Sequence, residues 1–182
     1  PLMSMAGSIV QRAYVPYPAG FGGAVGESNV PFDESVQKGL TRTISMTKQV
    51  ADKCPDTMFA YAGNSQGTVV VKLLIEKINS GAGPVAANRV GGISMFGDAS
   101  RPPTGGGITP SDITSSDYGD LAGRVLSNCT SGDLACDAPS DSPIVQMVAN
   151  LAGQSTLNMD DPIKSLTSIG EAMLNMTAKT IV

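Results

Sequence analysis

The sequence contains 182 residues, of which 41% are hydrophobic and 15% are charged, and its formal net charge is −4. A chain of this length and apolar content can bury one sizeable core, which favours a single main domain. The lack of a run rich in Lys and Arg argues against nucleic acid as a partner. No apolar run approaches the roughly 20 residues that a transmembrane helix needs, so we expect no transmembrane segment.

The N-terminal third predicts a strand, a loop and a helix. Residues 8–15 alternate weakly and carry β-branched and aromatic side chains, which is typical of a strand. Residues 16–23 contain two prolines and three glycines and must form a loop. Asp33 is the expected N-cap of a helix that continues to about Lys53. Its apolar positions fall on or near one face: Val36, Leu40, Ile44 and Val50.

The stretch from residue 57 to residue 79 predicts a strand, a tight turn and a helix. The turn is Gly63-Asn64-Ser65-Gln66-Gly67, which matches the G-x-S-x-G pattern of a nucleophile elbow. In such an elbow the serine lies on a strained turn, and Gly63 and Gly67 leave room on both sides. The alternative is a plain glycine-rich turn in which Ser65 is an ordinary N-cap.

The helix after this serine gives the turn an electrostatic role. Its first backbone N–H groups, beginning with that of Gln66, and the positive end of its dipole point at any oxyanion that forms beside the Ser65 hydroxyl. A serine also needs a base, and the sequence contains no histidine.

The central part of the chain continues the alternation of strands and helices. Residues 89–97 predict a third strand, apolar enough to be buried on both faces. Residues 98–119 are rich in Pro and Gly and predict a long surface loop. Residues 124–129 predict a fourth strand, which is followed by a loop over 130–142. This order of elements predicts an α/β fold with a mostly parallel sheet.

The C-terminal part predicts helices that pack against the domain and carry no functional residues. Residues 144–151 form a short helical pattern, and Asp161-Pro162 begins another. That second helix has an apolar stripe: Ile163, Leu166, Ile169, Met173 and Met176. We therefore expect a main domain over residues 1–153 and a C-terminal helical extension over 154–182, which packs on the domain or projects from it.

The three cysteines of the sequence are Cys54, Cys129 and Cys136. A disulfide between Cys129 and Cys136 would close a small loop of the kind found in extracellular proteins, and a reduced pair is the alternative. Without histidine or a second pair of cysteines, a metal site is not expected. We expect no cofactor.

Four motifs in order resemble the cutinase family. They also resemble the related lysin B esterases of mycobacteriophages and the PE-PPE domains of mycobacteria. The resemblance covers about residues 9–150. It rests on Tyr17-Pro18-Ala19, Cys54-Pro55-Asp56-Thr57, Gly63-Asn64-Ser65-Gln66-Gly67 and the cysteine-bracketed loop from Cys129 to Cys136.

This resemblance implies a small α/β-hydrolase fold, a three-layer α/β/α sandwich with a mostly parallel central sheet, and cleavage of esters. Ser65 matches the nucleophile of the family and Asp133 matches the acid of its triad. The family places a histidine after the acid, but residues 136–146 contain none. Asp141 is too weak a base to take a proton from a serine hydroxyl at neutral pH.

A second departure from the family lies at the N-terminus. Family members have an earlier strand, followed by a loop that supplies one oxyanion donor, and a cysteine that pairs with the one matching Cys54. We expect that this chain is a fragment of a longer protein or that the strand has been lost.

The sequence therefore favours a degenerate esterase domain that is catalytically inactive and serves structural assembly or surface binding, for instance in a bacteriophage virion. Its partners would be other proteins or copies of itself, with a lipid or cell-envelope ester as a ligand, and its location extracellular or virion-associated. The alternative is an active serine esterase on lipid, mycolyl or cutin-like esters whose base comes from outside these residues. In a third interpretation, Ser65 and Asp133 are ordinary loop residues of another α/β domain.

Overall fold

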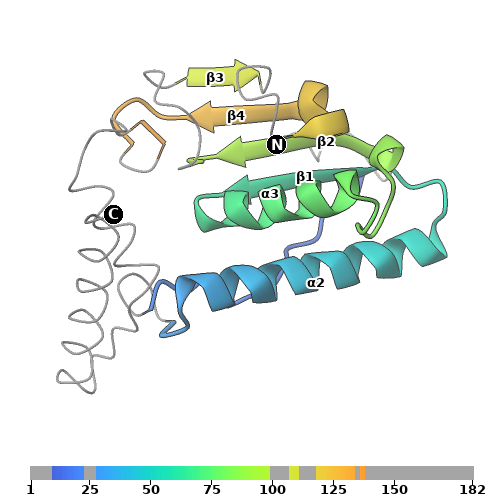
Figure 1. The fold of residues 1–182 in the computed structure, drawn as a ribbon, viewed down its shortest axis with the longest axis horizontal. Helices are drawn as coiled ribbons and strands as arrows, with labels where there is room; N and C mark the ends of the chain where they lie inside the picture. Colours follow the sequence, from blue (N-terminus) through green and yellow to red (C-terminus); the bar gives the residue numbers. More distant parts are fainter. Residues whose placement is uncertain (1–9, 23–27, 99–106, 111–117, 134–135, 138–182) are drawn as a thin grey trace, which may run out of the picture.

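A computed structural model of the chain describes residues 10–22, 28–98, 107–110, 118–133 and 136–137. Its centre is a four-stranded sheet with the strand order β1-β2-β4-β3 (Figure 1). Three strands run parallel: β1 (Phe59–Asn64), β2 (Val90–Phe96) and β4 (Val125–Cys129). The short edge strand β3 (Gly107–Pro110) pairs antiparallel with β4. This is the α/β class with a mostly parallel sheet that the sequence predicts.

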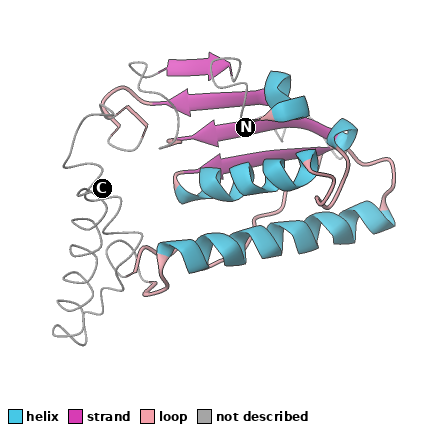
Figure 2. Ribbon diagram, in the orientation of Figure 1, coloured by secondary structure: helices cyan, strands magenta, loops and turns pink. Residues whose placement is uncertain are grey.

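Two helices pack on one side of this sheet (Figures 1 and 2). Helix α3 (Gln66–Asn79) follows β1 and buries its apolar face against the strands. Helix α2 (Phe32–Lys53) packs against α3, and its Thr47 hydroxyl lies 3.3 Å from the hydroxyl of Tyr61 in β1. Short 3-10 helices precede β2 (Ala87–Arg89) and β4 (Gly119–Arg124). The core lies between α3 and the sheet, with these side chains fully or almost fully buried: Leu74, Ile75, Val90, Met95 and Leu121.

The close approach of α2 to α3 depends on a glycine. A Cβ at Gly39 would lie 2.9 Å from a methyl carbon of Val70 and 3.1 Å from the ring of Tyr17. Any side chain at this position would therefore force the two helices and the Tyr17 ring apart. The absence of a Cβ allows the segment around Tyr17 to lie beside both helices.

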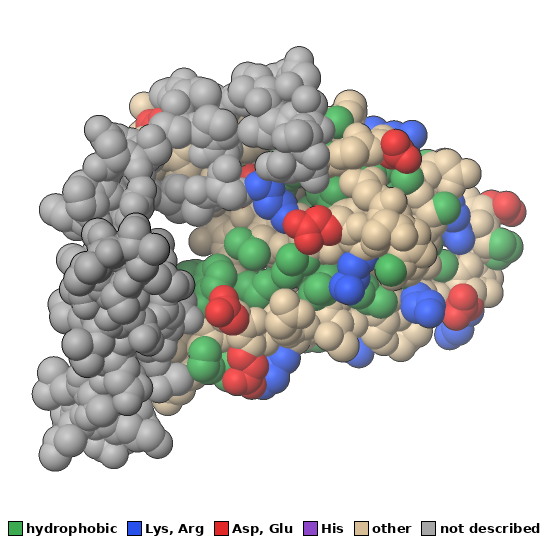
Figure 3. All heavy atoms as spheres, viewed as in Figure 1, with side chains coloured by type: hydrophobic (Ala, Val, Ile, Leu, Met, Phe, Trp, Pro, Cys, Tyr) green, Lys and Arg blue, Asp and Glu red, His purple; other side chains and the backbone are tan. Residues whose placement is uncertain are grey.

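The surface of this side is mixed in charge. On the face shown in Figure 3, charged side chains of both signs are spread over the helices, and apolar side chains gather between α2 and α3. The ion pair of Glu34 and Lys38 on α2 is solvent-exposed on both sides and contributes little to stability. No helix within the described ranges is long and apolar enough to cross a membrane.

Helix α2 ends at Lys53, as predicted, but it begins differently. Its N-cap is Pro31 and no side chain caps it, so the prediction of Asp33 as the N-cap is wrong. Asp33 lies in the first turn instead, where its negative charge still suits the positive end of the helix. Val36 and Leu40 are buried as predicted, whereas Val50, near the C-terminal end of α2, is 44% exposed.

The predicted strand over residues 8–15 is wrong for the part that the structure describes. Residues 10–20 form neither strand nor helix. β-branched and aromatic residues favour a strand only where a neighbouring strand accepts the pairing, and the described ladder partner of β1 is β2. Residues 16–22 lack regular secondary structure, as the prolines and glycines predict.

Two predictions for the centre of the chain need correction. The predicted loop over residues 98–119 contains β3, because pairing with β4 stabilises a glycine- and proline-bounded segment that local pattern alone does not reveal. Strand β2 is also not buried on both faces. Ile93 and Met95 are buried beneath α3, whereas Phe96 is 45% exposed, as is Leu126 of β4 at 49%.

The remaining elements follow the sequence closely. Strand β1, helix α3, strand β2 and strand β4 lie within two residues of the predicted bounds. The predicted helices over 144–151 and from Asp161 onward, and the proposed C-terminal extension, lie outside the described residues.

Candidate active site

Ser65 lies at the sharp turn between β1 and α3, and it is exposed. Its backbone has φ +49° and ψ −117°. A non-glycine residue rarely adopts such a conformation, which costs about 1–3 kcal/mol. The Ser65 N–H donates to the Phe96 carbonyl at 2.8 Å, and its carbonyl accepts from the Thr68 N–H at 2.9 Å. The peptides on both sides of the serine are therefore held by hydrogen bonds.

The Ser65 side chain makes no capping hydrogen bond to α3. An ordinary serine N-cap has an extended backbone, and its side-chain oxygen accepts a hydrogen bond from a backbone N–H of the first turn. This turn differs in both respects, so the plain N-cap interpretation does not describe it. The strand, turn and helix that the sequence predicts around Ser65 are confirmed.

The two glycines of the motif differ in what they do. A Cβ at Gly63 would lie 2.4 Å from the carbonyl oxygen of Gly67 and 2.8 Å from the backbone nitrogen of Thr68, which only glycine avoids. A Cβ at Gly67 would lie 3.8 Å from the Tyr17 hydroxyl, an ordinary contact. The structure thus requires glycine at position 63 but leaves room for a methyl group at position 67.

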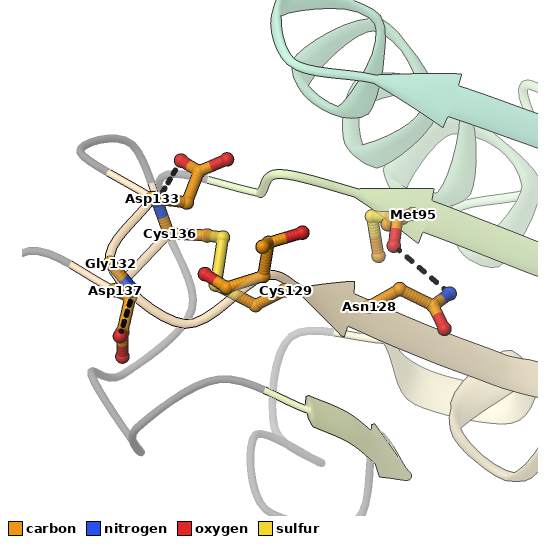
Figure 4. Close-up of a disulfide and its surroundings, with 8 residues drawn as sticks. Met95, Asn128, Cys129, Gly132, Asp133, Cys136 and Asp137 are labelled. Atoms are coloured by element: carbon orange, nitrogen blue, oxygen red, sulfur yellow. Dashed lines mark hydrogen bonds between the residues drawn. A yellow bond between two sulfur atoms is a disulfide. The ribbon is translucent and has the colours of Figure 1, made fainter.

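Asp133 lies in the loop after β4, inside a ring closed by a disulfide (Figure 4). The predicted pairing of Cys129 with Cys136 is confirmed, with the two Cα atoms 5.8 Å apart. Cys54 is a free, exposed cysteine. The Asp133 N–H donates to the Thr130 carbonyl at 3.0 Å, and the Cys136 N–H donates to the Asp133 carboxylate at 3.2 Å. These bonds fix the backbone and the carboxylate of Asp133 together.

The structure brings Ser65 and Asp133 to the same place. Both follow the carboxyl ends of parallel strands, which meet at one edge of the sheet. Gly97, at the end of β2, lies between them: a Cβ there would be 3.9 Å from the Ser65 nitrogen and 3.8 Å from Asp133 Oδ2. The Ser65 nitrogen and Asp133 Oδ2 are therefore no farther apart than the sum of these two distances, so both residues border the same part of the sheet edge.

A cleft of about 360 Å³ opens at this edge. Its lining mixes polar and apolar groups and includes Asp133 but not Ser65 itself: Asn64, Phe96, Gly97, Asn128, Cys129, Thr130 and Asp133. The Asn128 amide donates to the Ser94 hydroxyl at 3.2 Å, which holds this side chain in place. Across the described ranges, no three His, Cys, Asp or Glu side chains are grouped as metal ligands.

Among the residues that the structure describes, the groups near the turn do not replace a histidine base. The Tyr17 hydroxyl is close to Gly67, but burial raises the pKa of Tyr17 above its ordinary value of 10.0, so this phenol stays protonated at neutral pH. The Lys72 ammonium lies 3.6 Å from the carboxylate of Asp98, which is completely buried. Lys72 is thus committed to an ion pair that ties α3 to the end of β2.

The family model for cutinase matches residues 2–157, most of the chain. The chain belongs to the cutinase family. A solved structure that it resembles is the catalytic core domain of acetyl xylan esterase from Trichoderma reesei, with 20% sequence identity and a TM-score of 0.50 over 87% of this chain and 80% of that one. At this identity, the likeness shows the shared cutinase-family fold.

A curated relative of this cutinase-family chain is the carboxylesterase Culp6 homolog of Corynebacterium glutamicum. The two are 25% identical over 153 residues, which cover 69% of this chain and 50% of the relative. The chain therefore spans about half the length of the curated relative that it matches.

A buried polar cluster that the sequence did not reveal lies beside the elbow of this cutinase-family chain. Ser35, which is completely buried, and Gln66, which is 4% exposed, bond to each other and to Gly20. The bonded pairs are 15, 31 and 46 positions apart in the chain, so no local pattern pairs them. The one available signal was a glutamine at a helix position that faces the core.

Proposed function

We propose that this domain keeps the nucleophile and the acid of a cutinase-family esterase but lacks the base, so that these residues alone do not turn over esters. Ser65 would be the nucleophile, Asp133 the acid and the Gln66 N–H an oxyanion donor. One observation supports the proposal: Ser65 and Asp133 both lie beside Gly97 at one edge of the sheet, while the 182 residues contain no histidine.

The expected loss of activity is large. A serine hydroxyl attacks a carbonyl only when a neighbouring base takes its proton, and removing the base of a complete triad lowers kcat by a factor on the order of 10⁶. The oxyanion donor and the cleft then contribute binding and a small residual rate. We therefore propose a degenerate domain used for binding or for assembly with protein partners, for instance as an extracellular or virion subunit.

The second candidate is an active esterase on lipid, mycolyl or cutin-like esters whose base comes from outside these residues. The backbone of Ser65 favours it, because a strained turn costs about 1–3 kcal/mol and such strain is concentrated at active sites. The name of the carboxylesterase relative and the fact that this chain spans half of its length agree with this candidate.

Two measurements on the purified chain separate the candidates. One is hydrolysis of short p-nitrophenyl esters, and the other is labelling of Ser65 by a phosphonate ester, located by mass spectrometry. The degenerate domain predicts hydrolysis equal to that of Ser65→Ala and no labelling within hours. Fast labelling at Ser65, together with turnover that Ser65→Ala abolishes, would establish the active esterase instead.

A further inference from the structure

Three hydrogen bonds join helix α2, the loop of residues 17–22 and the elbow into one buried cluster, which we call the elbow clamp and define as Gly20, Ser35 and Gln66. The Gly20 N–H donates to the Ser35 hydroxyl at 2.9 Å. The Ser35 hydroxyl donates to Gln66 Oε1 at 2.9 Å, and Gln66 Nε2 donates to the Gly20 carbonyl at 2.7 Å. The three bonds form a closed ring of donors and acceptors.

The clamp fixes the side chain of Gln66 at both ends. Its carboxamide oxygen accepts from one element and its amide nitrogen donates to another, so rotation of the side chain breaks at least one bond. All of these bonds are buried, and water cannot replace a partner that moves away. Gln66 is also the first residue of α3 and follows Ser65 directly. A fixed side chain at this position fixes the peptide that joins it to the serine.

The loop on the other side of the clamp is itself unusual. Ala19 has φ +49°. Among the described non-glycine residues, only Ala19 and Ser65 have a positive φ. A Cβ at Gly20 would lie 2.3 Å from the Val30 carbonyl oxygen, so the loop packs directly on neighbouring backbone. Such a conformation persists only when its surroundings hold it, and the clamp supplies two of those bonds.

We propose that Ser35 and Gln66 are positioning residues of the nucleophile: through the clamp, their side chains hold the Ser65 to Gln66 peptide and thereby direct the Ser65 hydroxyl and the Gln66 N–H. The inference rests on the proposed role of Ser65. The two side chains touch no ester; they act through the peptide that does. Ser35 is the better residue for testing this role, because it lies on α2 and its substitution leaves the sequence of the elbow unchanged.

The test compares Ser35→Ala with Thr43→Val. Thr43 is a matched control, because it lies on the same helix, is also buried, and bonds the Gly39 carbonyl of its own helix at 2.8 Å. Hydrogen exchange is measured at the Ser65 and Thr68 amides, which donate to the Phe96 and Ser65 carbonyls. Ser35→Ala removes both buried bonds of the Ser35 hydroxyl, so we expect at least roughly 10-fold faster exchange of these amides. In Thr43→Val, we expect rates like those of the unchanged chain.

A second variant and a second readout make the test decisive. Gln66→Met keeps the length of the side chain and removes both of its hydrogen bonds. This variant replaces Ser35→Ala in the exchange measurement if Ser35→Ala does not fold. In ester hydrolysis with added imidazole, we expect both variants to lower kcat at unchanged KM.

Equal exchange of the elbow amides in the clamp variants and in Thr43→Val would overturn the inference. If the unchanged chain shows no imidazole-dependent hydrolysis, the proposed function fails, but the exchange measurement still decides on the clamp.

Discussion

The two halves of the proposed site, the side of the nucleophile Ser65 and the side of the acid Asp133, are held in different ways. The nucleophile side is held by packing: Ser65 lies between β1 and α3, Gly63 touches the backbone of Gly67, and the clamp anchors Gln66. The acid side is a short loop at the sheet edge, closed by the disulfide of Cys129 and Cys136. The nucleophile side should therefore respond to changes in packing, and the acid side to reduction. Each can be disturbed while the other stays in place.

The largest expected effect concerns Gly63. Gly63→Ala places a Cβ 2.4 Å from a backbone oxygen that cannot move without displacing α3, so we expect a loss of about 4 kcal/mol of unfolding free energy. Gly67→Ala, in the same motif, should change stability by less than about 1 kcal/mol, since its Cβ has room and alanine favours a helix. Urea denaturation measures both. Equal losses in the two variants would contradict the packing account of the elbow.

The next effect concerns the ion pair behind the elbow. Lys72→Met removes the ammonium group that lies 3.6 Å from the buried Asp98 carboxylate and should cost about 3 kcal/mol. Lys77→Met is the matched control, because Lys77 is exposed on the same helix and its loss should cost less than about 1 kcal/mol. Thermal denaturation compares them. A Lys72→Met variant as stable as the control would show that the pair does not stabilise the fold.

Reduction of the disulfide tests the acid side. Replacing Cys129 and Cys136 by serine should cost about 2 to 3 kcal/mol, the value for a loop of this size. Hydrogen exchange should rise at Asp133, whose N–H donates to the Thr130 carbonyl, and stay unchanged at Thr68 in the elbow. Faster exchange at both places would mean that the two halves form one cooperative unit and are not held independently.

The smallest effect is a pH dependence at the alkaline end. Burial raises the pKa of Tyr17 and of Tyr61 above 10.0; in Tyr61, the hydrogen bond from Thr47 and the charge of Arg89 act in the opposite direction. Because the folded-state pKa is higher than the unfolded one, the stabilisation is complete below pH 10 and is lost as pH rises through the folded pKa. Urea midpoints should fall above pH 10, and less steeply in Tyr17→Phe and Tyr61→Phe. The same slope in these variants would exclude the two phenols as its cause.

What the sequence predicts well is what depends on neighbouring residues. The turn around Ser65 is local: apolar residues precede it, a helical pattern follows it, and glycine is required at position 63. The disulfide is also local, since its cysteines are seven positions apart. The meeting of Ser65 with Asp133 followed from the rule that parallel strands place their carboxyl ends at one edge.

What the sequence did not reveal depends on distant contacts. Residues 10–15 have the composition of a strand, but composition does not show that a neighbouring strand is present to pair with them. Gly107–Pro110 pair with β4 against their local preference. Ser35 and Lys72 read as ordinary polar positions on helices, and only the fold shows that one holds Gln66 and the other Asp98.

The proposed site lacks a proton acceptor and is otherwise assembled. The most direct measurement is the rate of p-nitrophenyl acetate hydrolysis as imidazole is added, with Ser65→Ala as the reference for the reaction of imidazole with the ester in solution. The account predicts a rate at zero imidazole equal to that of Ser65→Ala, and a saturating increase that requires both Ser65 and Asp133. A rate with imidazole that is the same in Ser65→Ala as in the unchanged chain would contradict the account.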